Sequence, residues 1–145
     1  MFLKSDQNIM NILDLVEDPN TPSETLDRLS YDKSGQIRRG VADNPNTPIE
    51  ALERLSYDEA PGVRELVAHN RNTPPETLDR LSFDEEVCFR YYVAENPNTH
   101  PETLDCLSYD YYYCVRRAAA QNSNTPQYIK DLYKFKEYLK YYEQI

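Results

Sequence analysis

The chain has 145 residues, which is enough for one domain of ordinary size and too few for two. Its 25 acidic residues outnumber its 16 basic residues, and the net charge of −9 argues against nonspecific binding to duplex nucleic acid, which relies on Lys and Arg. No apolar run is long enough to span a membrane, and three cysteines do not form a paired disulfide framework.

The first element is a short apolar segment, residues 9–16, which Asn11 and Asp14 interrupt. Neither a basic leader nor a cleavage site accompanies it, so we expect no signal peptide and a cytoplasmic location. Residues 9–17 align instead with the second helix of the repeats that follow. We therefore predict that residues 1–19 form an N-terminal cap.

A period of 26 residues governs the chain from Asn20 onward. A fixed period in the range of 20 to 50 residues is typical of stacked supersecondary units, each of which buries its apolar face only against a neighbour. Asn, Leu and Arg recur at this spacing, in the columns Asn20, Asn46, Asn72, Asn98 and Asn124; Leu26, Leu52, Leu78 and Leu104; Leu29, Leu55, Leu81 and Leu107; and Arg38, Arg64, Arg90 and Arg116.

The first half of each unit predicts a short helix. In the unit that starts at Asn46, Thr47 suits the N-cap and Pro48 suits the first helical position. Glu50 can close a capping box with Thr47. This helix is expected to end at about Leu55.

The second half of the unit predicts a second helix over residues 59–69, with Ser56 or Asp58 as its cap. Val63 and Val67 lie four residues apart and give this helix a core face. Helices of two to three turns are marginal alone, so the stacking of repeats must stabilise them.

The last element is a longer helix that Thr125 and Pro126 open and that runs to about Tyr142. We predict that residues 124–145 form a C-terminal capping helix with Tyr128, Leu132, and Phe135 or Leu139 against the last repeat. The predicted fold is an all-α, right-handed α-solenoid of four 26-residue helix-pair repeats over residues 20–123, with capping helices at both ends, in one domain of residues 1–145.

The pattern N-T-P-x-E-x-L-x-x-L-S-[YF]-D-x-x-x-x-[IVF]-R-x-x-V-A-x-N resembles the leucine-rich repeat variant family and is similar to HEAT-like helical repeats. In HEAT-like repeats an Asp and an Arg six residues apart link adjacent units. The resemblance therefore implies a polar ladder of the pairs Asp32/Arg38, Asp58/Arg64, Asp84/Arg90 and Asp110/Arg116. One variant-repeat protein adds an N-terminal cysteine cluster that binds iron and sulfur, but this chain has no Cys before Cys88, so we expect no such cofactor.

The reactive residue types do not form a catalytic or metal-binding pattern. Cys88 and Cys114 share one phase of successive repeats, where we predict free thiols about 8–10 Å apart, too far for a disulfide. No C-x-x-C motif, phosphate loop or H-E-x-x-H motif is present. His69 and His100 belong to no arrangement of base and nucleophile, so we expect no enzyme, no catalytic residues, no cofactor and no metal.

Tyrosine is the most informative residue type for function. We predict that the column Tyr31, Tyr57, Phe83 and Tyr109 packs between helices. Tyr91, Tyr92, Tyr111, Tyr112 and Tyr113, however, occupy positions that hold other residue types in the other repeats, and Tyr is favoured at interfaces. The alternative is that Tyr92 and Tyr113 fill gaps against the terminal helix.

The outward positions of the second helices vary most between repeats. One row reads Arg39, Glu65, Tyr91 and Arg117, and another reads Asp43, His69, Glu95 and Gln121. Such rows line a continuous face in a solenoid, which is its usual binding surface. The predicted partner-binding residues are Arg39, Glu65, His69, Tyr91, Tyr92, Glu95, Tyr111, Tyr112 and Arg117.

We interpret the chain as a noncatalytic protein-binding or scaffold module. Its partner is expected to be another protein, favoured to be basic, with no direct nucleic acid and no membrane. The first alternative is an acidic inhibitor that mimics nucleic acid, through the columns Glu24, Glu50, Glu76 and Glu102 and Asp27, Glu53, Asp79 and Asp105. The second is a HEAT-like nucleic-acid-processing enzyme, which requires a basic groove that this charge does not supply.

Overall fold

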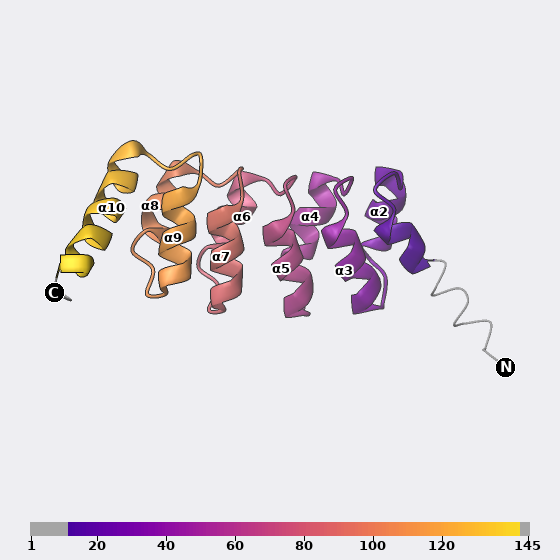
Figure 1. The fold of residues 1–145 in the computed structure, drawn as a ribbon. Coiled ribbons are helices and arrows are strands. Elements are labelled where there is room, and N and C mark those ends of the chain that lie inside the picture. The colour runs from indigo at the N-terminus through magenta and orange to yellow at the C-terminus, as the bar shows by residue number, and fades with distance from the viewer. Residues whose placement is uncertain (1–11, 143–145) are drawn as a thin grey trace. The chain divides into compact units, whose positions relative to one another are not determined.

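A computed structural model describes residues 12–142, and these residues form helices and turns with no strand (Figure 1). Residues 12–17 are helical. The helices that follow are α2 (Ser23–Leu29), α3 (Gly35–Asp43), α4 (Ile49–Leu55), α5 (Pro61–His69), α6 (Pro75–Leu81), α7 (Val87–Glu95), α8 (Pro101–Leu107), α9 (Tyr113–Gln121) and α10 (Gln127–Tyr142).

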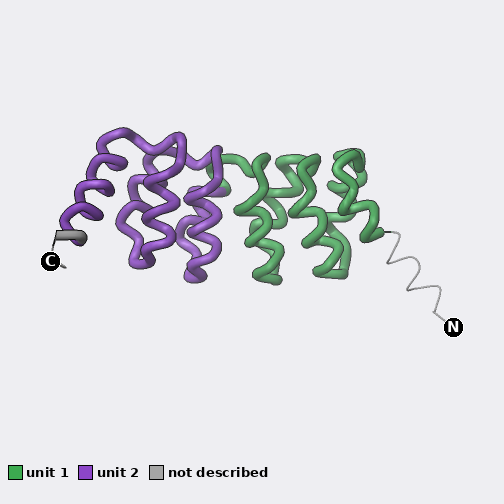
Figure 2. Tube along the Cα trace, in the orientation of Figure 1, with its two compact units in different colours: residues 1–77 green, residues 78–145 purple. Residues whose placement is uncertain are grey.

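The order of helices confirms the predicted all-α fold of helix-pair repeats. Helices of seven residues alternate with helices of nine from α2 to α9, and the nine-residue helices begin at residues 35, 61, 87 and 113, which are 26 apart. The chain contains two compact units, unit 1 (residues 1–77) and unit 2 (residues 78–145), shown in Figure 2. We describe each unit by itself.

Both units pack their second helices side by side, α3 with α5 in unit 1 and α7 with α9 in unit 2 (Figure 1). The predicted leucine positions of α4 and valine positions of α5 are buried, and so are Phe89 and Val93 of α7. Burial of these apolar side chains supplies the main stabilising free energy of helices that would be marginal alone.

The predicted capping box is wrong, although the helix it was meant to start is present. Pro48 precedes α4 as its N-cap residue, and no side chain caps this helix. Thr47 is buried, and its hydroxyl donates to the carbonyl oxygen of Val41, in the last turn of α3, at 2.5 Å. The threonine therefore satisfies the end of the preceding helix, where carbonyl groups lack intrahelical partners.

The second helix of this repeat begins two residues later than predicted, at Pro61. Asp58 accepts a hydrogen bond from the backbone N–H of Ala60 at 2.9 Å, so it orders the turn before the helix. The Ser56 hydroxyl donates instead to the Glu53 carbonyl oxygen, at the end of α4.

Buried asparagines join successive repeats within each unit. Asn44 donates through Nδ2 to the carbonyl oxygens of Val16 and Asp18, both at 2.8 Å. Asn70 makes the equivalent bonds to Ala42 and Asn44, and in unit 2 Asn122 makes them to Ala94 and Asn96. We call the set of Asn44, Asn70 and Asn122 the Asn ladder.

Helices stand at both ends of the repeats, where the two caps were predicted. Residues 12–17 behave as the end of a second helix, since Thr21 donates to the Leu15 carbonyl oxygen as Thr47 does to Val41; residues 9–11 lie outside the described range. Helix α10 is present and packs on α9.

The predicted inward face of α10 is correct in part. Leu132 and Leu139, two of the predicted residues, line a pocket together with Arg116 of α9. Tyr128, however, is 60% exposed, and Phe135, the alternative to Leu139, is also exposed. Ile129 is fully buried beside Tyr128, and the ring of Tyr133 packs beside that of Tyr113.

Candidate partner-binding surface

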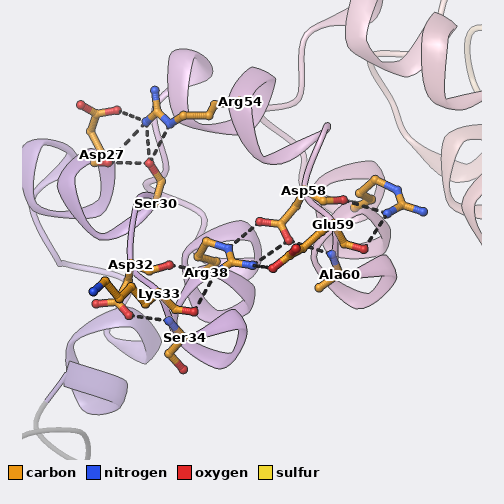
Figure 3. A network of polar contacts seen from close by, with 11 residues as sticks. Asp27, Ser30, Asp32, Lys33, Ser34, Arg38, Arg54, Asp58, Glu59 and Ala60 are labelled. Carbon is orange, nitrogen blue, oxygen red and sulfur yellow. Dashed lines mark hydrogen bonds and ion pairs between the residues drawn. The ribbon is translucent and has the colours of Figure 1, made fainter.

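The arginine column of the second helices is bonded within the stack. Arg38 donates through Nε and Nη2 to the two carboxylate oxygens of Asp58, in the next repeat, at 2.6 and 3.0 Å (Figure 3). Its Nη1 donates to the backbone carbonyl oxygens of Asp32 and Lys33. The hydrogen bond from Arg38 lowers the pKa of Asp58, which stays ionised in a largely buried position.

Unit 2 repeats this arrangement. Arg90 donates through Nε to Asp110 at 2.7 Å and through Nη1 to the Asp84 carbonyl oxygen at 2.8 Å. Burial raises the pKa of Asp110, but the hydrogen bonds from Arg90 and from the Tyr112 N–H outweigh burial and lower it. The predicted Arg–Asp ladder is confirmed at Arg38 and Arg90, so these two arginines are part of the framework.

The aromatic column at the turns does not pack between helices as predicted. Tyr31 is 67% exposed and Phe83 is 82% exposed, and Tyr57 and Tyr109 are exposed as well. In unit 1, Arg54 lies over the Tyr31 ring at 3.8 Å from its centroid. Its guanidinium also bonds Asp27 at 2.6 Å (Figure 3). In unit 2, Lys136 lies 4.9 Å from the centroid of the Tyr109 ring, so cations cover these two rings in place of apolar side chains.

Unit 1 places its three predicted site residues on the outward face of the second helices. Arg39 of α3 and His69 of α5 are exposed, and Glu65 of α5 is half-buried. Arg39 lines a pocket of about 430 Å³ beside Asp43, whereas His69 lines a smaller pocket of about 180 Å³. The structure therefore does not bring these three residues into one pocket.

Unit 2 brings three of the predicted residues together. Tyr91 and Glu95 of α7 and Arg117 of α9 line one pocket of about 360 Å³. The Tyr91 hydroxyl donates to Glu95 at 2.6 Å, which raises the pKa of the phenol. The Tyr92 ring meets the Tyr91 ring edge to face, with centroids 5.5 Å apart. We call the surface formed by Tyr91, Tyr92, Glu95 and Arg117 the α7–α9 face.

Tyr111 and Tyr112 lie in the turn before α9. Tyr111 is 88% exposed, and its ring meets that of Tyr112 edge to face at 5.2 Å. The Tyr112 N–H donates to Asp110 at 2.8 Å, and the Arg90 guanidinium lies 5.8 Å from the Tyr112 ring. The Arg–Asp ladder thus holds the backbone of this turn while the side chain of Tyr111 faces solvent.

Tyr113 agrees with the alternative prediction, in which it fills a gap against the terminal helix. Its ring packs beside that of Tyr133 of α10, with centroids 6.5 Å apart. It also lines the pocket of the α7–α9 face, together with Cys114 and Gln121. None of these three residues is among the predicted partner-binding residues. Gln121 belongs to one of the variable rows of the second helices, and this row was the sequence signal that could have identified it as a site residue.

The remaining reactive side chains form no site of their own. Cys88 and Cys114 are free thiols, as predicted, and so is Cys106. His100 bonds Asp79 through Nδ1 at 2.8 Å. Within residues 12–142, His, Cys, Asp and Glu side chains form no group of three that could hold a metal ion. No helix in the same range is long and apolar enough to cross a membrane.

Comparison with known proteins agrees with the repeat geometry. A family model described as leucine rich repeat variant matches residues 35–60 and 61–86. Residues 35–86 are leucine-rich repeat variant units. Each match begins with a second helix, α3 or α5, so this family divides the same period at a different point from the units counted from Asn20. No curated protein and no solved structure matched the chain.

Proposed function

We propose that the chain is a noncatalytic module that binds another protein through the outward face of its second helices, with the α7–α9 face as the centre of the contact. The observation that supports this proposal is the pocket in unit 2, lined by Tyr91, Glu95 and Arg117. Tyr91 and Glu95 differ from their counterparts in every other repeat, and Arg117 shares its residue type only with Arg39, while the framework residues around them recur.

The chemistry of this face suits a protein partner. Tyrosine and arginine are the residue types most enriched among those that dominate binding energy at interfaces. Tyr91 is half-buried and bonded to Glu95, so its ring is already held in place and loses little conformational entropy on binding. Glu95, Arg117 and Gln121 surround it with groups that fix orientation.

The acidity of the chain supports a basic partner by steering the encounter, but it does not favour mimicry of nucleic acid. Glu24 and Glu50 are exposed, whereas Asp27 is paired with Arg54. Packed helices lie about 8–10 Å apart, so one carboxylate per repeat gives one charge in that distance, compared with one per about 1.7 Å along duplex DNA. Because the first column is sparse and the second is partly neutralised, we favour the α7–α9 face.

A photo-crosslinking experiment tests this proposal. A photoreactive residue at Gln121 should capture a partner in native extract, and Tyr91→Ala with Arg117→Ala should reduce its affinity about 10-fold or more, the usual cost of losing a hot-spot residue. The matched control is Glu24→Gln with Glu50→Gln, which removes exposed carboxylates of unit 1. Loss of binding in the control alone, with a steep dependence on salt, would support mimicry and overturn the proposed face.

A further inference from the structure

The Arg–Asp ladder is interrupted at Arg116. Its Nη1 donates to the carbonyl oxygens of Asp110 and Tyr111, both at 2.7 Å, as the Nη1 of each paired arginine does in its own turn. For Arg38 and Arg90, the Asp that accepts from Nε lies 20 residues further along the chain. Twenty residues after Arg116 the chain carries Lys136.

Arg116 is therefore oriented like the paired arginines but has no carboxylate acceptor among residues 12–142. Elsewhere the same guanidinium edge makes two hydrogen bonds to one carboxylate, the geometry that an arginine fork matches best. Arg116 is half-buried, and its guanidinium lies 5.9 Å from the centroid of the Tyr113 ring.

The groove between α9 and α10 gives this edge a pocket. Its volume is about 290 Å³, and Arg116, Lys136 and Lys140 contribute three positive charges to its lining against one negative charge from Glu137. Leu132 and Leu139 form an apolar wall. A pocket of this size, at the lower end for small-molecule sites, suits a compact ligand with one charged and one apolar end.

Tyr133 also lines this pocket, and its hydroxyl oxygen is buried. Burial and the neighbouring Tyr113 hydroxyl raise the pKa of Tyr133, so the phenol keeps its proton. The Tyr113 ring packs beside the Tyr133 ring, so this hydroxyl has a neighbour within the chain and its burial alone calls for no ligand.

We propose that this pocket, which we call the Arg116 pocket, binds the carboxylate of an organic acid with a small apolar group. The carboxylate takes the place of the missing Asp on Arg116, while the apolar group lies on Leu132 and Leu139. Two sources share this chemistry, the C-terminal residue of a peptide and a free carboxylic acid.

The test is an NMR titration of the ¹⁵N-labelled full chain with N-acetyl-leucine and, separately, with its carboxamide. The acid should produce saturable shifts of amide signals in α9 and α10, and the carboxamide should not. Arg116→Gln should weaken binding of the acid at least tenfold. Lys134→Gln, which changes an exposed cation of α10 outside the Arg116 pocket, should leave it unchanged.

Two substitutions on α10 keep the proposal testable if Arg116→Gln fails to fold. Leu132→Ser should weaken binding of N-acetyl-leucine with little effect on the stability of the free protein, because it removes part of the apolar wall at a side chain that is already exposed. Lys136→Glu supplies an internal carboxylate and should abolish binding. Equal shifts with acid and carboxamide, no saturable shift with the acid, or full binding by folded Arg116→Gln would overturn the proposal.

A second comparison distinguishes the two sources of the carboxylate. A blocked pentapeptide that ends in leucine and 4-methylpentanoate are titrated side by side. Tighter binding of the pentapeptide assigns the pocket to a peptide C-terminus, because residues before the last one then add contacts. Equal affinity assigns it to a free carboxylic acid, and no binding of either overturns the proposal.

Discussion

Replacement of Asn44 by Ala tests the Asn ladder, the main polar link between repeats. Asn44 is 3% exposed and makes three hydrogen bonds outside its own backbone. Its Nδ2 donates to the carbonyl oxygens of Val16 and Asp18 at 2.8 Å, and its Oδ1 accepts from the Asn46 N–H at 2.9 Å. The substitution removes all three and leaves the backbone partners in place.

The expected loss of stability follows from these contacts. Each hydrogen bond contributes about 0.5–1.5 kcal/mol net, and an unpaired buried partner adds a desolvation cost. The carbonyl group of the buried Val16 loses its bond, whereas the exposed Asp18 can bond water instead. We therefore expect Asn44→Ala to lower the free energy of unfolding by about 2–3 kcal/mol. Asn20→Ala removes one side-chain bond among residues 12–142, to the exposed Asp18 carboxylate, so it should cost less than about 0.5 kcal/mol.

Urea denaturation followed by far-ultraviolet circular dichroism measures both variants. Repeat stacks can unfold in more than one step, so hydrogen exchange of α3 amides is measured in parallel to locate the loss. Asn122→Ala, with the same bonds in unit 2, serves as a replicate. An Asn44→Ala variant as stable as Asn20→Ala would refute the assignment of this energy to the ladder.

Two further predictions concern unit 1. Above its ordinary pKa of 3.8, Asp58 contributes stability through Arg38 that is lost as the pH falls through its lowered folded-state pKa, so Asp58→Asn should flatten the acid limb of a stability–pH profile. A Cβ atom at Gly40 would lie 2.2 Å from a methyl group of Val16, so Gly40→Ala should destabilise by about 1–3 kcal/mol in urea. Gly62→Ala, where a Cβ meets nothing within 4 Å, should stabilise the protein or leave it unchanged.

The period alone predicted the helix pairs because every repeat carries the same apolar spacing. It did not predict what the recurring polar residues bond. Thr47 has the sequence context of an N-cap, yet it is the hydroxyl donor to Val41, six residues before it. A capping box and a link to the preceding helix use the same residue types, so the choice depends on packing that only the structure shows.

The candidate site was predicted only in part for a related reason. The variable rows identified Tyr91, Glu95 and Arg117, which share one pocket, because framework residues cannot vary at buried positions. The aromatic column that begins at Tyr31 was predicted to pack between helices, because a recurring aromatic residue suggests a core position. These side chains are exposed instead. Arg54 recurs less regularly, yet its guanidinium covers that ring, and this contact between repeats is not visible in either residue alone.

Some residues of unit 2 break the 26-residue period and so lose a recurring Arg–Asp pair. In one such case, other side chains of the same chain replace the lost arginine. In unit 1, Arg54 pairs with Asp27 of the preceding repeat. The corresponding positions in unit 2 hold Cys106 and Asp79, so the arginine is missing. Asp79 instead bonds His100, which replaces a recurring proline in the same repeat as Cys106.

Asp79 also accepts a hydrogen bond from the Thr103 hydroxyl, through its second carboxylate oxygen. The loss of an arginine is thus matched by two new bonds to the same carboxylate. A partly buried carboxylate without a partner would be costly, and the chain removes that cost locally.

The break in the period at Lys136 is a different case. Arg116 keeps the orientation of its ladder, but the position that should supply its carboxylate carries a second cation, and Lys140 adds a third beside it. Like charges at one site raise the free energy of the folded chain, and the described residues offer only Glu137 against them. The repeat at Cys106 shows that this chain accommodates a broken pair with new partners. At Arg116 the partner that fits the arrangement is a ligand.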